Sequence, residues 1–293
     1  MLCPLMIRFH RYPGKKLVIA ATLLAFAALA FMVRARTQEA VNTALYKGVD
    51  ARDMEAVRDA LEQGADPNMM ADARGRHLTL LQSLSFWKDK HSQDHAVPIL
   101  MAALSWSDSE VYKPHPANDQ DYMPALAKRT RQQTTQMLAI IQLLLQHGAH
   151  VDSEDSRGQT ALMMASGDGV PRLVTCLLDN GADVKHLDHG NRSALHEAVF
   201  FSETPTARLL LQRGADPNTQ LEHNDFTPVM TSVINDDEEL TRLLLEAGAD
   251  VTLRGRDGHT VVSYEALDHF SPETRHQINL SIRRYRKTNP PQK

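Results

Sequence analysis

The sequence predicts an all-α protein: a solenoid of about five helix-turn-helix units with short turn or hairpin loops, one large insertion and an N-terminal apolar helix. A ten-residue string of the type LLLQRGADPN recurs five times, with a glycine at the same place in each copy. The last three intervals between these glycines are 33, 33 and 34 residues, whereas the first is 84 and so includes an insertion of 51. The glycines are Gly64, Gly148, Gly181, Gly214 and Gly248.

Each repeated string predicts the end of an amphipathic helix. Apolar residues stand three, four and, in most copies, seven positions before the glycine, which places them on one helix face. The glycine ends the helix because it adopts the left-handed conformation without a Cβ clash. About a dozen residues later a hydroxyl residue precedes a second apolar pattern, and such a residue caps a helix start. The pattern reads TALM from Thr160, SALH from Ser193, TPVM from Thr227, TVVS from Thr260 and, more faintly, TLLQ from Thr79.

The period and the two patterns together resemble the ankyrin repeat, in which T-P-L-H opens the first helix and G-A-D follows the second. The resemblance covers residues 38–270, although only Thr227-Pro228 keeps the proline and only His196 keeps the histidine. Stacked units of this kind bury one another's apolar faces, because one helix pair cannot bury its own. The resemblance implies units near 38–70, 71–152, 153–185, 186–218 and 219–252, with a partial unit at 253–270.

The insertion is expected at residues 86–134, between the two helices of the second unit. Long loops in compact domains are often functional, and Trp and Tyr are enriched in binding hot spots. We therefore expect partner binding by Trp87, Trp106, Tyr112 and Tyr122. The alternative is that these aromatic side chains pin the insertion to its own solenoid.

The N-terminus has the pattern of an export signal. Residues 1–16 are basic, and residues 17–33 follow without a charge. This order predicts a signal anchor with its N-terminus in the cytoplasm, or a signal peptide that is cleaved near Ala30. Seventeen residues lie at the lower limit for a helix that spans a bilayer. The other interpretation is a core helix in a cytoplasmic scaffold.

The C-terminus predicts a capping helix over residues 271–288, followed by a tail at 289–293. Ser271, Pro272 and Glu273 supply a cap residue, a first-turn proline and a first-turn acid. Such a helix would cover the apolar face that the last repeat leaves open.

The charge distribution argues against nucleic acid as a ligand. Residues 37–270 hold 20 basic and 35 acidic residues, and an acidic body repels phosphate backbones. The same charge favours a protein partner with a basic patch.

The sequence offers few residues for chemistry, and we expect no cofactor, no metal and no small-molecule substrate. No phosphate loop, dinucleotide glycine pattern or nucleophile elbow is present. His91 with His95, and His186 with His189, have spacings that suit a metal, but no third ligand accompanies them. Cys176 takes the place of a leucine in the repeated string, which predicts a packed residue and not a nucleophile.

These observations favour a non-catalytic protein that binds another exported protein, either tethered to a membrane or secreted across it. A bacterial inner-membrane protein with one span and a periplasmic repeat domain fits best. One version is an immunity-type neutraliser of a secreted toxin. Alternatives of other classes are an enzyme with a metal site in the insertion and a cytoplasmic scaffold.

Overall fold

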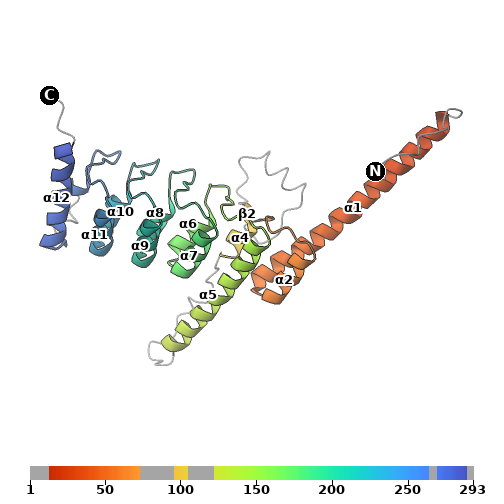
Figure 1. The fold of residues 1–293 in the computed structure, drawn as a ribbon, viewed down its shortest axis with the longest axis horizontal. Coiled ribbons are helices and arrows are strands. Elements are labelled where there is room, and N and C mark those ends of the chain that lie inside the picture. The colour runs from red at the N-terminus through yellow and green to blue at the C-terminus, as the bar shows by residue number, and fades with distance from the viewer. Residues whose placement is uncertain (1–12, 73–95, 105–121, 264–268, 289–293) are drawn as a thin grey trace.

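The computed structural model describes residues 13–72, 96–104, 122–263 and 269–288. In these residues the helices stand in a row, with α1 (Pro13–Ala51) extending from one end and α12 (Pro272–Thr288) closing the other (Figure 1). The row confirms the predicted solenoid architecture. It also contains one short antiparallel pair of three-residue strands, which leaves the predicted all-α class unchanged.

Three helix pairs form the regular part of the row. The first helices have seven residues each and the second helices nine. The pairs are α6 (Ala161–Gly167) with α7 (Pro171–Asp179), α8 (Ala194–Phe200) with α9 (Thr204–Gln212), and α10 (Pro228–Ile234) with α11 (Glu238–Glu246).

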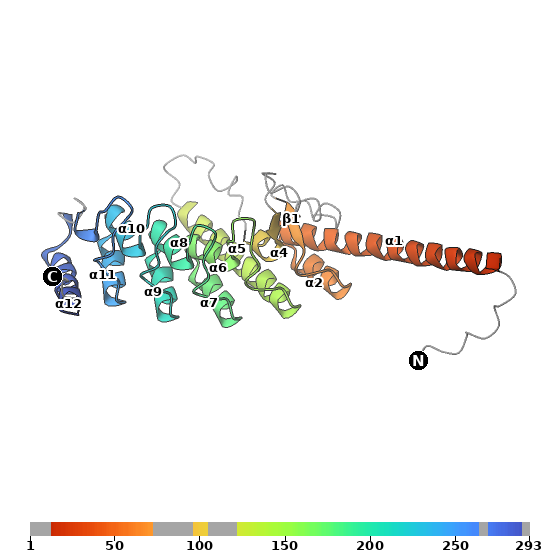
Figure 2. The ribbon, with the colours of Figure 1, turned by 90° about the horizontal axis from the view of Figure 1, so that it is seen from above.

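The helices form two layers (Figure 2). First helices contact first helices along the row, in the order α1, α4, α6, α8 and α10. Second helices contact second helices in the order α2, α5, α7, α9, α11 and α12. Each unit therefore packs mainly on its two neighbours, as expected for a solenoid.

Local sequence explains where these helices begin and end. Thr160, Ser193 and Thr227 are extended N-cap residues, as the hydroxyl pattern predicts. Gly181 and Gly214 follow the second helices with φ values of +88° and +93°. A Cβ at either glycine would meet no atom within 4 Å, so the left-handed backbone alone favours glycine.

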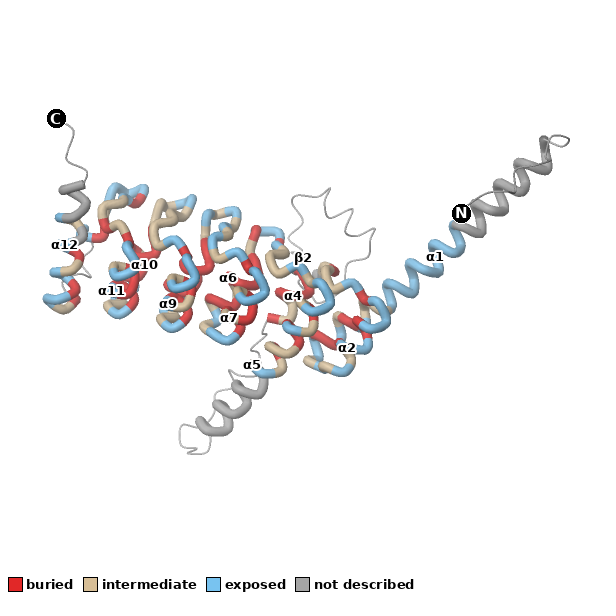
Figure 3. The backbone as a smooth tube through the Cα atoms, viewed as in Figure 1, coloured by how far each residue is buried: buried red, intermediate tan, exposed pale blue. Residues whose placement is uncertain are grey.

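The core runs along the contact between the layers (Figure 3). The middle leucine of the repeated string is fully buried in four units, on α5 (Tyr122–Gln146), α7, α9 and α11. These residues are Leu144, Leu177, Leu210 and Leu244. Burial of one leucine side chain contributes about 2 kcal/mol, so this position of the repeated string stabilises each of the four units.

The second unit differs from the prediction. Strand β1 (Met70–Asp72) pairs with β2 (Ala96–Pro98), and α4 (Ile99–Ala102) follows directly. Ile99, Leu100 and Leu104 are buried in the core, and α4 lies between α1 and α6. The interpretation of 86–134 as one projecting insertion is therefore wrong for residues 96–104. Thr79, the expected start of this unit's first helix, lies outside the described residues.

The extra residues of the second unit are divided between two places. From Gly148 to the N-cap Thr160 is 12 residues, whereas Gly64 to the N-cap Pro98 is 34. The remaining residues of the insertion lie between α4 and the buried part of α5. The proline of the opening pattern thus occurs twice, at Pro98 and Pro228, each beside a buried apolar residue.

The first unit shares a helix with the N-terminal segment. Helix α1 runs without a break for 39 residues, and only its last part packs on α2 (Met54–Glu62), through Leu45 and Val49. Side chains of the predicted anchor from residue 17 to residue 27 lie outside the described part of the chain. Among the residues that the structure describes, no helix is long and apolar enough to cross a membrane.

The last unit is short and capped. Its first helix is one 3-10 turn, Val261–Ser263, and α12 packs on α11 through residues that include the buried Ile278. The Glu238 carboxylate on α11 accepts hydrogen bonds from the hydroxyls of Ser271 and Thr274 at the start of α12. These hydroxyls, Ser271 first, hold the pKa of Glu238 below its ordinary value.

Replacing Leu100 tests the position of α4. Its side chain is 2% exposed, so Leu100→Ala should lower the free energy of unfolding by about 3 kcal/mol, through lost burial and a cavity. Urea denaturation followed by circular dichroism measures this change. Leu280→Ala on α12, where the side chain is 37% exposed, is the control and should cost less than about 1 kcal/mol. Equal, small effects of both substitutions would contradict a core position for α4.

Candidate interaction surface

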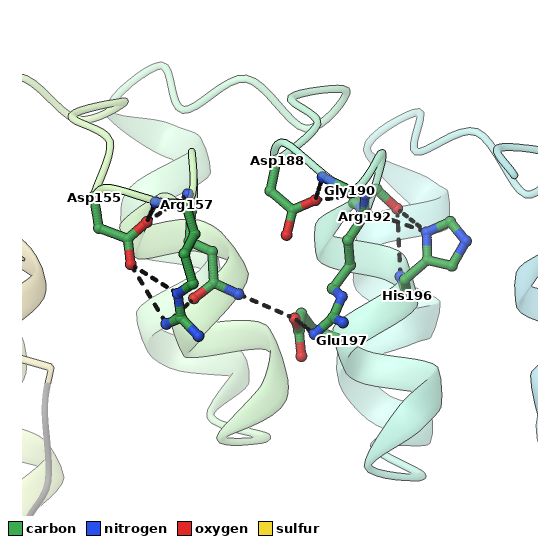
Figure 4. Close-up of polar contacts among 9 residues, drawn as sticks. Asp155, Arg157, Asp188, Gly190, Arg192, His196 and Glu197 are labelled. Atoms are coloured by element: carbon green, nitrogen blue, oxygen red, sulfur yellow. Dashed lines mark hydrogen bonds and ion pairs between the residues drawn. The ribbon is translucent and has the colours of Figure 1, made fainter. Parts of the chain in front are cut away.

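The turns that precede the first helices are built in the same way in neighbouring units (Figure 4). The Oδ1 atom of Asp155 accepts main-chain N–H groups two and four residues later, at 2.8 and 2.9 Å. Asp188 does the same one unit later, with both distances 2.8 Å. A carboxylate at the start of each of these turns fixes the backbone that follows, as Asx turns do.

Main-chain hydrogen bonds join the tips of successive turns. They recur at intervals of 33 and 34 residues, which is the period of the repeat. The N–H of His189 donates to Arg157 O at 2.9 Å, that of Glu222 to Gly190 O at 2.9 Å, and that of Arg256 to Asn224 O at 2.8 Å. The tips therefore form a connected row of fixed spacing, and a preordered surface loses little entropy when it binds a partner.

A polar cluster crosses two units on the first-helix layer. The carboxylate of Glu197 on α8 is 3.0 Å from Nη1 of Arg192, and Nε2 of Gln159 in the preceding turn donates to it at 3.5 Å. The Glu197 side chain is only 10% exposed. A largely buried carboxylate needs such partners, so these contacts fix the relative position of the two turns.

His196 combines helix capping with a buried ring. The main-chain N–H of Ser193 donates to His196 Nδ1 at 3.2 Å, and the N–H of His196 donates to Ser193 Oγ at 3.3 Å. Nδ1 is therefore an acceptor, and the neutral ring carries its proton on Nε2. Nε2 is buried without a hydrogen bond of normal geometry, although the main chain of Phe226 and Thr219 lies close.

Burial controls the protonation of this histidine. It lowers the pKa of His196 from the ordinary 6.5 to about 4, and the nearby main chain of Phe226 only partly opposes the shift. His196 is thus neutral at physiological pH. The repeat resemblance identified the residue, but its protonation state depends on burial that the sequence does not reveal.

The predicted partner-binding residues fall largely outside the described chain. Trp87, Trp106 and Tyr112 belong to segments that the structure does not describe. Tyr122 begins α5, but its side chain is not described. Their role in binding therefore stays a prediction.

The described candidates for metal binding and thiol chemistry, His186 and Cys176, contact or pack against the repeats themselves. His91 and His95 lie outside the described residues, whereas His186 Nε2 is 2.8 Å from the carbonyl oxygen of Gly158. No group of three or more metal-ligating side chains occurs among the residues that the structure describes. Cys176 is buried, as the repeat pattern predicts, and burial raises the pKa of its thiol.

Stacked helix pairs with bonded turns define this chain as a helical repeat protein, and comparison with known proteins gives the family. The model for three copies of the ankyrin repeat matches residues 132–221, and the model for a single ankyrin repeat matches residues 224–256. The chain contains ankyrin repeats. This class of repeat generally forms a non-catalytic module for protein-protein interaction.

Curated relatives match this chain over part of its length. The chain is 35% identical to an ankyrin repeat-containing protein of Treponema pallidum over 44% of this chain and 43% of the relative. It is 40% identical to Protein PhlB of Serratia liquefaciens over 36% of this chain and 46% of the relative. It is 36% identical to BCL-6 corepressor-like protein 1 of Homo sapiens over 38% of this chain and 6% of the relative. The chain spans less than half the length of each.

His196 should make stability depend on pH. Between pH 6.5 and about 4 the unfolded chain binds a proton at this residue and the folded chain does not. Stability that is present above pH 6.5 is therefore lost as the pH falls, by up to about 3 kcal/mol. Two other units have a methionine, Met163 or Met230, at the position of His196. The substitution His196→Met should therefore fit this position and remove the loss of stability at low pH. Parallel urea-denaturation curves of both proteins from pH 7 to pH 4.5 would contradict the assignment.

Proposed function

We propose that this chain is a non-catalytic protein-binding module, held at a membrane by residues 17–33, with its repeat domain on the far side of that membrane. The observation that carries the proposal is the connected row of turns, which offers a preordered surface. Its partner is another exported protein with a basic patch.

The exposed end of the apolar segment supports the membrane attachment. Leu29, Phe31, Met32 and Val33 on α1 are between 54% and 70% exposed. Soluble monomers rarely expose a contiguous apolar patch of this kind, unless it contacts a partner or a membrane. Arg34 and Arg36 follow directly, where a membrane-spanning helix would meet water.

Anchoring fits the fold better than cleavage, and both leave the repeat core intact. Residues 17–33 continue into the first unit within a single helix, so anchoring would hold that unit against the membrane without a flexible linker. Cleavage near Ala30 would instead remove part of α1, while the buried residues of the first unit, from Leu45 onward, would remain. Fractionation of the expressed protein separates these two forms by size.

The acidic body supports a basic partner. Residues 37–270 carry 15 more acidic than basic residues, and complementary charge speeds encounter with a basic surface. Neutralisation of a secreted toxin is one function of this form.

A topology reporter tests the membrane placement. Alkaline phosphatase fused after Lys293 is active only outside the bacterial cytoplasm, so we expect activity from the full chain. Removal of residues 17–33 should abolish this activity, because the apolar segment is then absent. A matched fusion after Arg11 should stay inactive. Activity that survives the deletion, or no activity from the full chain, would contradict the placement.

Affinity capture tests the partner. The full chain should retain a basic protein at low ionic strength and release it near 0.5 M salt, because salt screens exposed charges. Deletion of 86–134 would remove the buried α4, so the matched variant is instead the combination W87S, W106S and Y112S. Loss of the partner with this variant would assign recognition to the predicted aromatic residues, and retention would exclude them. A captured acidic protein, or none, would contradict the proposed partner.

A further inference from the structure

An exposed apolar cluster lies at the ends of the first helices, away from the turns. Phe200 is the last residue of α8 and Ile234 the last residue of α10, and Phe201 follows Phe200. Their exposed fractions are 63% for Phe200, 56% for Phe201 and 47% for Ile234. We call these three residues the phenylalanine face. The first helices begin at the turns, so this face lies at the opposite edge of the row.

Contacts with neighbouring units fix the phenylalanine face. The rings of Phe200 and Phe201 meet edge to face, with centroids 5.0 Å apart. Phe201 lies over Gly167 at the end of α6, where an added Cβ would be 3.2 Å from ring carbons. Asn235 Nδ2 donates to the carbonyl oxygens of Val199 and Phe200 at 3.4 and 3.3 Å. The face therefore comes from two units, and Phe201 also contacts a third.

Carboxylates border the phenylalanine face. The three loops that join first to second helices in these units are residues 168–170, 201–203 and 235–237. They contain four acidic residues and no Lys or Arg. These residues are Asp168, Glu203, Asp236 and Asp237. Glu203 extends over the preceding loop, because its carboxyl carbon would be 2.0 Å from a Cβ added to Gly169. Asp236 is 3.4 Å from His269, and the Asp237 side chain caps α11 by accepting the N–H of Leu240 at 2.9 Å.

This combination selects one kind of occupant. A symmetric second copy would bring the same four carboxylates against each other, and like charges across an interface cost binding energy. Nucleic acid and anionic lipid would be repelled by the same border. A protein segment with large apolar side chains and flanking Lys or Arg residues would fill the face and neutralise its border.

We propose that the phenylalanine face binds a basic amphipathic segment of the protein partner. This inference rests on the proposed function and adds a second surface, at the edge opposite the turns, together with the chemistry of the segment that it binds. Aromatic side chains at the centre of an interface contribute most of the affinity, and charges at its rim contribute mainly to the rate of encounter. The phenylalanine side chains should therefore determine the dissociation rate, and the carboxylates should determine the salt dependence.

A random 16-residue peptide library displayed on phage tests the proposal, with the full chain immobilised. Selected peptides should be enriched in Lys or Arg together with Phe, Leu or Trp. Synthetic copies should bind the variant F200A/F201A at least tenfold more weakly, as measured by fluorescence anisotropy. The control L280A removes an exposed apolar side chain from α12, away from both the turns and this face, and should leave affinity within twofold. The variant D168N/E203Q/D236N should slow association and flatten the dependence on salt.

The outcomes separate this inference from the proposed function. Selected peptides that are acidic or neutral, no selected peptide, or equal affinity for F200A/F201A and the full chain would each overturn the phenylalanine face. In that case affinity capture by the full chain still tests the proposed function. If F200A/F201A captures a basic partner as well as the unchanged chain does, the proposed function stands, but the partner binds another surface. Unchanged circular dichroism spectra exclude unfolding as the cause, since both phenylalanines are exposed.

Discussion

The fold depends on burial between units. Each helix pair in the regular part of the row packs on the pairs beside it, and Leu177, Leu210 and Leu244 are fully buried in this row. This constraint fixes the helix pairs and not the length of the loops, because Leu144 stays fully buried in the second unit although that unit carries 51 additional residues. It also explains the ends, where α1 contributes its last turns to the first unit and α12 covers the last one. Terminal units need such polar covers, since an open apolar face would aggregate.

Fixed spacing gives the row two surfaces of different character. At the turn edge, main-chain bonds link the tips, and the cluster around Glu197 ties neighbouring turns together. At the opposite edge, the loops carry carboxylates around Phe200, Phe201 and Ile234. Both surfaces follow from the same stacking, because residues at equal positions in successive units are brought side by side. Sequence differences at those positions, such as Gly167, Phe200 and Ile234, are therefore free to encode recognition while the leucines maintain the core.

The sequence predicts what recurs and misses what occurs once. The glycine stops, the hydroxyl caps and the buried leucines repeat five times or nearly so, and each has a local physical cause. The place of α4 in the core, as the first helix of the second unit, was missed because Val97 precedes Pro98 where a hydroxyl residue is expected, and because 22 additional residues separate it from the preceding glycine. The string PILM from Pro98 does resemble PVMT from Pro228, so the signal was present. Phe200 and Phe201 were missed because apolar residues at a helix end look like core, although two adjacent ones cannot both face it.

The continuous helix α1 adds a geometric constraint to any partner. From Val33 to Val41, the first residue of α1 that packs on the core, a helix rises about 12 Å. If residues 17–33 lie in a bilayer, the first unit stands that close to the lipid surface, without a linker that could reorient it. The row runs at an oblique angle to α1 (Figure 1). The distance between the repeats and the membrane would therefore depend on the packing of α1 against α2. With residues 17–33 in a bilayer, the proposed partner would have to present its basic segment near the membrane, and a protein in transit across that membrane would meet this requirement more readily than one diffusing freely.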